Sequence, residues 1–346
     1  MEGWNHQAIN NKRLLLIIFN VSFIIYYVKY KFFYSITNWF IGGFQVIKVT
    51  NLTVKYKDLV AVDSISFEVK KGEIFGIIGP NGAGKTSAIE CLEGLKKASG
   101  GEASVMGINP ANRRKLYEYI GVQLQEASFP DSIKVKELCQ LFSSFYKNPA
   151  DYNALLERFD LADKKNAYVK KLSGGQRQKI SVVAALIANP QIIFLDELTT
   201  GLDPQARIDM WELIKSLRDE GKTILMTTHF MEEAEYLCDR VCLMVKSKIA
   251  AIGTVKELVE QAQLSQKISF TSKKTDREAL EGIPCITKIT ENNGAYDLYG
   301  NGKNLLRDVV LYITEKNIDF EDLSCSKPGL EDVFLKLTGY RLEAEI

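Results

Sequence analysis

Apolar and polar residues alternate along Val46–Tyr56 and again along Ser64–Val69, a pattern that predicts half-buried antiparallel strands. Three other segments are largely apolar without alternation: Ile74–Ile78, Gln191–Asp196 and Lys222–Thr228. Continuous apolar runs of this length are typical of strands that are buried on both faces. The second and third runs each follow a helical stretch, so the pattern predicts an α/β fold with a parallel sheet and crossover helices.

The segment at about residues 126–172 has a mostly helical pattern and no strand-like run, which predicts a helical subdomain. From residue 266 the pattern changes to a strand, a helix, a hairpin turning at Asn293-Gly294, an amphipathic helix and another strand. The order β-α-β-β-α-β predicts a small ferredoxin-like α+β domain over residues 266–346. A short helix ended by Gly339 is expected to close that domain.

Residues 1–45 are more apolar than the rest of the chain. Leu14–Val28 forms an apolar run that Lys29 and Lys31 interrupt, and it is shorter than the roughly 20 residues that a membrane-spanning helix needs. Two interpretations of this segment stay open. It is either a membrane-associated extension or a translated leader ahead of a true start at Val46.

The chain has 346 residues, of which 46% are hydrophobic and 25% are charged, as expected of a globular protein with about two domains. The larger domain is expected at residues 46–265. A formal net charge of +1 gives no electrostatic reason to expect nucleic acid binding. Cys238 and Cys242 share one helical face, but no further cysteine or histidine lies close enough in the sequence to complete a zinc site. The six cysteines are therefore expected to be reduced thiols in a cytosolic protein.

The sequence GPNGAGKT at Gly79–Thr86 satisfies the pattern G-x-x-x-x-G-K-[ST] between a buried strand and a helix. Its glycines allow backbone N–H groups to face the β- and γ-phosphates of a nucleotide. Lys85 is expected to neutralise phosphate charge, and Thr86 to place a hydroxyl on Mg²⁺. A chance glycine-rich turn is the weaker explanation, because the strand, the helix and the Lys-Thr pair occur together.

Asp196 and Glu197 end the second of the apolar runs. Asp196 is expected to hold Mg²⁺ through its water shell, and Glu197 to polarise an attacking water molecule. Alone, two acids at a strand end are weak evidence, because solvated loop residues look the same. Behind a buried strand that follows a phosphate loop, they predict a site that hydrolyses nucleotides.

Leu172–Gln176 (LSGGQ) precedes an apolar helical run and forms a second loop suited to phosphate. This loop matches the signature sequence of the ATP-binding cassette (ABC) transporter ATPases. Together with the phosphate loop and the two acids, it makes nearly all of residues 46–265 resemble that family. The resemblance implies a P-loop NTPase of the ABC type, with a parallel core sheet, an antiparallel β subdomain and a helical subdomain. In that family the signature loop caps ATP held by a second subunit in a head-to-tail dimer.

The resemblance also implies roles for single residues. Tyr56 corresponds to an aromatic residue that stacks on adenine, with a surface tyrosine at a strand end as the alternative. Gln125 corresponds to a glutamine that reaches Mg²⁺ and the attacking water, and Gln123 is the competing choice. Asp203 corresponds to a residue of the loop that crosses the dimer interface in that family. His229 matches the histidine that contacts the γ-phosphate.

One position departs from the family pattern. Leu198 occupies the place of the proline that usually follows the catalytic glutamate. Because proline would stiffen this turn, altered rigidity rather than loss of hydrolysis is expected. The residues expected to act in catalysis are Glu197, His229 and Gln125, and those expected to hold Mg²⁺ are Thr86, Gln125 and Asp196. The residues expected to bind the nucleotide are Tyr56, Gly79, Pro80, Asn81, Gly82, Ala83, Gly84, Lys85, Thr86, Ser87, Ser173, Gly174, Gly175, Gln176 and Asp203.

The resemblance implies the ATP-hydrolysing subunit of a membrane exporter, at the cytoplasmic face of the cell membrane, with ATP and Mg²⁺ bound. The expected partners are a second copy of the subunit and a separately encoded permease, without nucleic acid. Apart from residues 1–45, the sequence has no apolar run as long as a membrane span, so the transport path is expected in another polypeptide. Gly329–Gly339 (GLEDVFLKLTG) is similar to the tail of drug- and antibiotic-resistance-type exporter ATPases.

Two other functions fit the sequence less well. ABC proteins that act on ribosomes carry two cassettes in tandem, and those that act in DNA repair carry long heptad coiled coils, whereas this sequence has one cassette and no such heptads. A scaffold that binds ATP without hydrolysing it has no need of both Glu197 and His229. The sequence therefore favours an exporter ATPase, and it leaves the transported substrate open.

Overall fold

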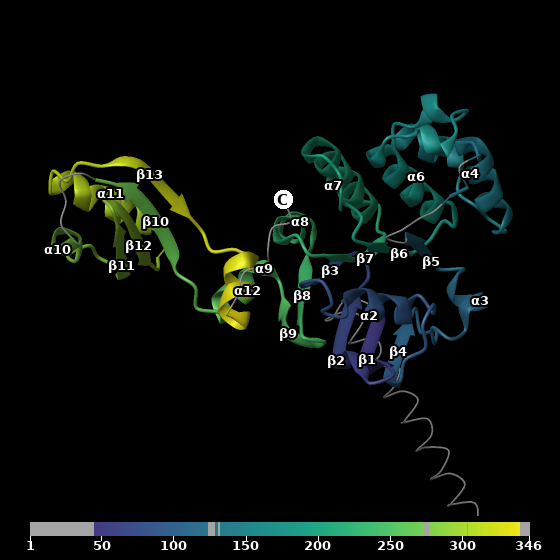
Figure 1. Ribbon diagram of the computed structural model, residues 1–346, viewed down its shortest axis with the longest axis horizontal. Helices are drawn as coiled ribbons and strands as arrows, with labels where there is room; N and C mark the ends of the chain where they lie inside the picture. The colour runs from purple at the N-terminus through teal and green to yellow at the C-terminus, as the bar shows by residue number, and fades with distance from the viewer. Residues whose placement is uncertain (1–44, 124–128, 131, 273–276, 303, 340–346) are drawn as a thin grey trace, which may run out of the picture.

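The computed structural model describes residues 45–123, 129–130, 132–272, 277–302 and 304–339 (Figure 1). Its centre is a six-stranded sheet in the order β5-β6-β7-β3-β8-β9. The first five strands are parallel, and β9 runs antiparallel to β8 at one edge. The bounds are Ile120–Gln123 for β5, Ile192–Asp196 for β6, Thr223–Thr228 for β7, Ile74–Ile78 for β3, Arg240–Val245 for β8 and Lys248–Gly253 for β9. The parallel sheet predicted from the apolar runs is thus confirmed.

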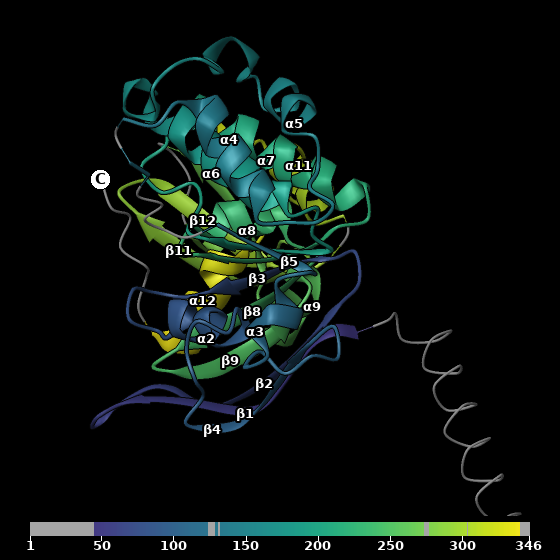
Figure 2. The ribbon, with the colours of Figure 1, turned by 90° about the vertical axis from the view of Figure 1, so that its right-hand side faces the viewer.

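The core strands are buried on both faces because alternate side chains enter different clusters. In β6, Ile192 and Phe194 pack into the cluster on one side, and Ile193 and Leu195 pack into the cluster on the other. Figure 2 shows the core sheet between α4, α6 and α7 on one face and α2 on the other. This burial on two faces explains the continuous apolar sequence of these strands. The helices are α2 (Lys85–Leu92), α4 (Val135–Ser144), α6 (Gly174–Ile187) and α7 (Pro204–Asp219).

A three-stranded antiparallel sheet, in the order β2-β1-β4, closes the side of the molecule on which α2 lies (Figure 2). It is the antiparallel β subdomain that the sequence predicts. Phe67 of this sheet stacks on Phe75 of β3, with ring centroids 5.4 Å apart, and so joins the two sheets. The strands are β1 (Gln45–Tyr56), β2 (Leu59–Lys70) and β4 (Gly100–Val105), and the short helix α3 (Arg113–Leu116) leads from β4 towards β5.

The described part of residues 126–172 is helical, as predicted. It contains α4, α5 (Tyr152–Arg158) and two 3₁₀ turns at Ala162–Lys164 and Val169–Lys171. Both α4 and α5 pack against α6, the helix that the signature loop begins. The helical subdomain is therefore built directly onto the signature helix.

The C-terminal elements form a second antiparallel sheet in the order β11-β12-β10-β13, which lies at the opposite end of the molecule from α4 (Figure 1). Its buried cluster includes Ile268, Tyr296 and Leu298 from the strands and Val309 from a helix. The elements follow the chain in the order β-α-β-β-α-β. They are β10 (Gln266–Thr271), α10 (Arg277–Leu280), β11 (Ile286–Asn292), β12 (Ala295–Gly300), α11 (Leu305–Glu315) and β13 (Glu321–Ser326).

The last helix, α12 (Leu330–Thr338), does not close the small domain as the sequence analysis expected. It packs instead against α8 (Met231–Leu237) and α9 (Val255–Gln261) of the larger body. Leu330, Val333 and Phe334 form its buried face, in one cluster with residues of both helices. Because these three positions lie on one side of a helix, burying them requires an apolar groove, and α8 and α9 provide it.

Candidate nucleotide-binding and hydrolysis site

The phosphate loop connects β3 to α2, and two of its glycines leave no room for a side chain. A Cβ on Gly79 would lie 2.2 Å from the carbonyl oxygen of Met244, and a Cβ on Gly84 would lie 2.1 Å from the carbonyl oxygen of Ala61. Gly84 also has a φ of 98°, in the left-handed region that favours glycine. The backbone is therefore held close to its neighbours, in a shape that only glycine at these positions permits.

A pocket of about 430 Å³ lies beside this loop. Its lining includes Asn81–Ser87 of the loop and of α2, together with Tyr56 and Glu197. Within the described chain, Ser173–Gln176 of the signature loop are not part of the lining. The hydroxyl oxygen of Tyr56 lies 3.1 Å from that of Ser87, so the tyrosine is placed where a base attached to a bound triphosphate could reach it.

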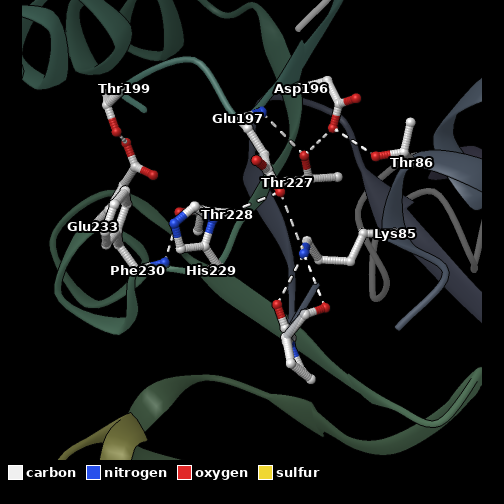
Figure 3. Close-up of polar contacts among 12 residues, drawn as sticks. Lys85, Thr86, Asp196, Glu197, Thr199, Thr227, Thr228, His229, Phe230 and Glu233 are labelled. Atoms are coloured by element: carbon white, nitrogen blue, oxygen red, sulfur yellow. Dashed lines mark hydrogen bonds and ion pairs between the residues drawn. The ribbon is translucent and has the colours of Figure 1, made fainter. Parts of the chain in front are cut away.

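Lys85 is the buried cation of the site, with only 4% of its side chain exposed. Its Nζ donates to the carbonyl oxygens of Gly79, at 2.9 Å, and Pro80, at 3.2 Å. The same Nζ lies 3.4 Å from Oε1 of Glu197 (Figure 3). These oxygens compensate the cost of burying the ammonium group and hold it at the pocket.

Asp196 ends β6 beside Thr227 of β7, its partner in the parallel register. The Thr227 hydroxyl donates to Oδ1 of Asp196, and the Thr86 hydroxyl lies 3.5 Å from the same oxygen (Figure 3). Burial raises the pKa of Asp196, and the hydrogen bond from Thr227 opposes that change. A hydroxyl and a carboxylate are hard oxygen ligands of the kind that Mg²⁺ prefers, so Thr86 and Asp196 fit that ion.

Glu197 and His229 come from the ends of neighbouring strands. Oε1 of Glu197 lies 3.6 Å from Nδ1 of His229. The imidazole lowers the pKa of Glu197, burial opposes this, and Lys85 lowers it further, so the pKa lies below its ordinary value. Glu197 is therefore ionised at neutral pH and can accept a hydrogen bond from water. Nδ1 of His229 thus faces Glu197, whereas Nε2 is buried and has no hydrogen-bond partner among the described residues, which leaves it for a ligand.

The signature loop forms the N-terminus of α6. Ser173 accepts a hydrogen bond from the N–H of Gln176, whose side chain accepts one from the N–H of Ser173, so the two residues form a capping box. Ser173 and Gly174 are exposed, and a Cβ on Gly174 would contact nothing within 4 Å. Asp203, also exposed, caps α7 by accepting from the N–H of Ala206 at 2.9 Å. Both caps are thus open to another molecule.

Of the two glutamines that competed for one role, the structure describes only Gln123. Gln123 is the last residue of β5 and is 1% exposed. Its Oε1 accepts a hydrogen bond from the backbone N–H of Asp196 at 3.2 Å, which gives it a structural function. Gln125 lies outside the described residues, so its role stays a prediction.

Residues 62–200 match the family model described as ABC transporter. The chain is 36% identical over 316 residues to the Nod factor export ATP-binding protein I of Burkholderia orbicola, across 86% of this chain and 98% of that protein. This chain is a member of the ABC transporter family. It is also 32% identical over 305 residues to the daunorubicin resistance ATP-binding protein DrrA3 of Streptomyces coeruleorubidus, across 85% and 96% of the two chains.

Two solved structures agree with this assignment. The ATP-binding subunit of an ABC transporter matches with a TM-score of 0.58 and 25% identity, over 62% of this chain and 92% of that chain. A dimeric bacterial ABC transporter cassette matches with a TM-score of 0.55 and 25% identity, over 60% and 98%. The expected ABC-type P-loop fold is therefore confirmed, and the chain is an ATP-binding, ATP-hydrolysing subunit of an ABC transporter.

None of the helices in the described ranges has both the length and the hydrophobicity of a membrane span. The apolar run Leu14–Val28 lies outside these ranges, and both interpretations of it stay predictions.

Two residues that support the ABC site could not be identified from the sequence. Thr227 links the two acids, because its hydroxyl donates to Asp196 and accepts from the N–H of Glu197 at 3.1 Å. Glu233 of α8 is fully buried, and its Oε1 accepts from the Thr199 hydroxyl at 2.7 Å and from Trp211 Nε1 at 3.0 Å. It thus connects α8, the helix that follows His229, to the turn that follows Glu197. The only sequence signal for Thr227 is a polar residue within an apolar strand.

Leu198, the departure from the family pattern, is fully buried with Leu195, Leu202 and Met210. Side-chain burial therefore anchors this turn where a proline ring would restrict the backbone. Glu197, just before it, has a φ of 47°, which is uncommon for a residue with a side chain and typical of strained functional positions.

Proposed function

We propose that two copies of this chain bind two MgATP molecules head to tail and hydrolyse them to drive export through a separate permease. The observation that carries the proposal is the division of the phosphate-binding groups. Lys85 and Glu197 lie at one pocket, whereas the open signature loop at Ser173–Gln176 lies outside its lining. A second copy can supply the missing cap to each pocket. The similarity to a dimeric cassette supports this arrangement.

In the proposed reaction, water attacks the γ-phosphorus of ATP, and ADP leaves. Glu197 accepts a hydrogen bond from the water and orients it. Lys85 moves its ammonium from the loop carbonyls to the phosphate oxygens, where it offsets the charge that develops. His229 donates a ring N–H to the γ-phosphate, which satisfies a nitrogen that is otherwise buried without a partner.

Thr86 and Asp196 would hold Mg²⁺, with Gln125 as a further predicted ligand. When bound, the ion neutralises phosphate charge. Thr227 orients the Asp196 carboxylate by its hydrogen bond, and the loop from Gly79 to Ser87 cradles the phosphates through its backbone. Tyr56 stacks on the adenine from the edge of the same pocket.

We propose residues 46–265 as the ATPase domain and residues 266–346 as an accessory domain whose last helix, α12, returns to the ATPase. The subunit acts at the cytoplasmic face of the membrane, where the helical subdomain and the Gln125 loop transmit dimer closure to the permease. The names of the relatives refer to Nod factor export and daunorubicin resistance. From these names we extend only the direction of transport, export, to this chain.

The proposal is tested with Glu197→Gln, which keeps the shape of the side chain and removes its charge. We expect this variant to lose hydrolysis and to form an ATP-dependent dimer in size-exclusion chromatography, because ATP stays trapped between the copies. Glu232→Gln, on the exposed face of α8, is the matched control and should behave as the wild type.

A second substitution identifies the groups that hold the dimer together. Adding Ser173→Arg to Glu197→Gln should abolish the dimer, because the bulky side chain fills the place of the opposing nucleotide. A Glu197→Gln variant that binds ATP and stays monomeric would overturn the dimeric mechanism. A dimer that survives Ser173→Arg would overturn the role of the signature loop.

A further inference from the structure

Lys96 lies on the aromatic ring of Tyr56. Its Nζ is 4.3 Å from the ring centroid, within the range of a cation–π interaction. The same Nζ lies 2.5 Å from Oε2 of Glu90, while the hydroxyl of the tyrosine lies 3.1 Å from that of Ser87. The ring is therefore held on one face and at its hydroxyl by α2 and the turn that follows this helix.

The backbone of the turn after α2 positions Lys96 beside Tyr56. The N–H groups of Leu95 and Lys96 both donate to the carbonyl oxygen of Glu90, at 2.9 Å and 3.0 Å. Gly94 has a φ of 74°, and a Cβ on it would lie 2.4 Å from the carbonyl oxygen of Pro110, so glycine is required at this position. The reversal of the chain sets Lys96 beside both Glu90 and the end of β1.

Tyr56 and Lys96 line two different cavities. Tyr56 lines the pocket of about 430 Å³ beside the phosphate loop, whereas Lys96 lines a cavity of about 600 Å³ together with Lys97 and Asn109. Neither residue belongs to the lining of the other cavity. Lys96 therefore contacts the ring without lining the pocket beside the phosphate loop, and the base is inferred to stack on the ring face that the ammonium group does not cover.

We propose that Lys96 is a positioning residue for the nucleotide base, acting through Tyr56. It fixes the ring before ATP arrives, so less conformational freedom is lost on binding. It also attracts the π electrons of the ring away from the face that meets the base. Because aromatic faces are negative, this reduces the repulsion between the two stacked rings. The inference rests on the proposed function, since it requires Tyr56 to contact the base.

The test compares binding of ATP with binding of inorganic triphosphate, which has no base. Affinities are measured with the full chain by competition against a fluorescent ATP analogue, without Mg²⁺ so that no turnover occurs. Lys96→Met should weaken ATP binding about 3- to 10-fold and leave triphosphate binding unchanged. In hydrolysis assays it should raise KM and leave kcat unchanged.

Matched variants separate this role from general effects of charge and folding. Lys97→Met removes a lysine from the same cavity without touching the ring, and it should change neither affinity. Lys96→Arg keeps a cation over the ring and should restore ATP binding. Tyr56→Ala should weaken ATP binding, and adding Lys96→Met to it should cause no further loss, because the lysine acts only through the ring.

The outcomes distinguish this inference from the proposed function. If Tyr56→Ala leaves ATP affinity unchanged, the base-stacking role of Tyr56 is wrong, and the inference fails with it. If Tyr56→Ala weakens ATP binding but Lys96→Met does not, only the inference is overturned. Equal loss of ATP and triphosphate binding in Lys96→Met would also overturn it, because the effect would then be one of net charge.

Discussion

Replacing Glu93 with glutamine should remove a large part of the pH dependence of stability in the ABC domain. Glu93 occupies the C-cap position of α2 and is 1% exposed. Neither of its carboxylate oxygens has a hydrogen-bond partner among the described residues. Burial, followed by the negative charges of Asp196 and Glu90, raises the pKa of Glu93 to about 8. At neutral pH the folded protein therefore holds this side chain mostly in its protonated form.

The sign of the effect follows from the number of protons bound in each state. Between pH 4.5 and about 8, the folded protein keeps a proton on Glu93 that the unfolded chain has released. The free energy of unfolding therefore falls by about 1.4 kcal/mol for each unit of rising pH in this interval. The stabilisation that comes from keeping the proton on Glu93 is complete below pH 4.5 and is lost above about pH 8. In total it amounts to at most about 5 kcal/mol of the free energy of unfolding.

Glutamine has the shape of glutamic acid but does not ionise. Glu93→Gln and the wild type should therefore be similarly stable near pH 5, and the variant should gain an increasing advantage towards about pH 8. Urea denaturation of both proteins at a series of pH values measures the difference, in which groups that titrate alike in both proteins cancel. Glu118→Gln, at an exposed site, is the control and should leave the pH profile unchanged. A constant difference between Glu93→Gln and the wild type across this range would refute the reasoning.

Three further substitutions test single contacts. His229→Ala should lower kcat about 100- to 1,000-fold with little change in ATP binding, as measured by single-turnover phosphate release; an unchanged kcat would exclude a contact with the γ-phosphate. Leu198→Ala should lower the free energy of unfolding by about 2–5 kcal/mol, because it leaves a cavity in the core, and equal stability would contradict the burial of this side chain. Phe334→Ala should speed hydrogen exchange in both α12 and α8, whereas exchange that increases only in α12 would argue that the two helices are not coupled.

The contiguous parts of the site were predictable because their conformation is decided locally. The sequence GPNGAGKT holds its glycines, lysine and threonine within eight residues, and a strand must precede it and a helix must follow it. The apolar runs likewise predicted β3, β6 and β7, because burial on both faces favours apolar side chains at most positions of a strand. The capping box of Ser173 and Gln176 follows from residue types three positions apart.

Contacts between distant segments were not predictable in this way. Thr227 meets Asp196 because β6 and β7 pair in one particular parallel register, and neither strand encodes that register in its own sequence. Glu233 is a buried acid in a helix whose sequence would also suit an exposed position, and only its partners Thr199 and Trp211 explain it. A pattern of residue types predicts which side chains are buried, but it does not predict which distant segments of the chain pack against them.

By itself, the sequence determined which chemical groups the protein possesses and which backbone conformations its short segments adopt. The sequence alone identifies the lysine of the phosphate loop, the two acids and the signature loop, because each of these features depends on residues adjacent along the chain. Only the tertiary structure decided which of these groups share a pocket, that α12 leaves the small domain to pack on α8 and α9, and that Lys96 lies on Tyr56. These contacts depend on the free energy gained when many side chains that are far apart in the sequence are buried together. No short segment contains that information, because the side chains meet only in the folded chain.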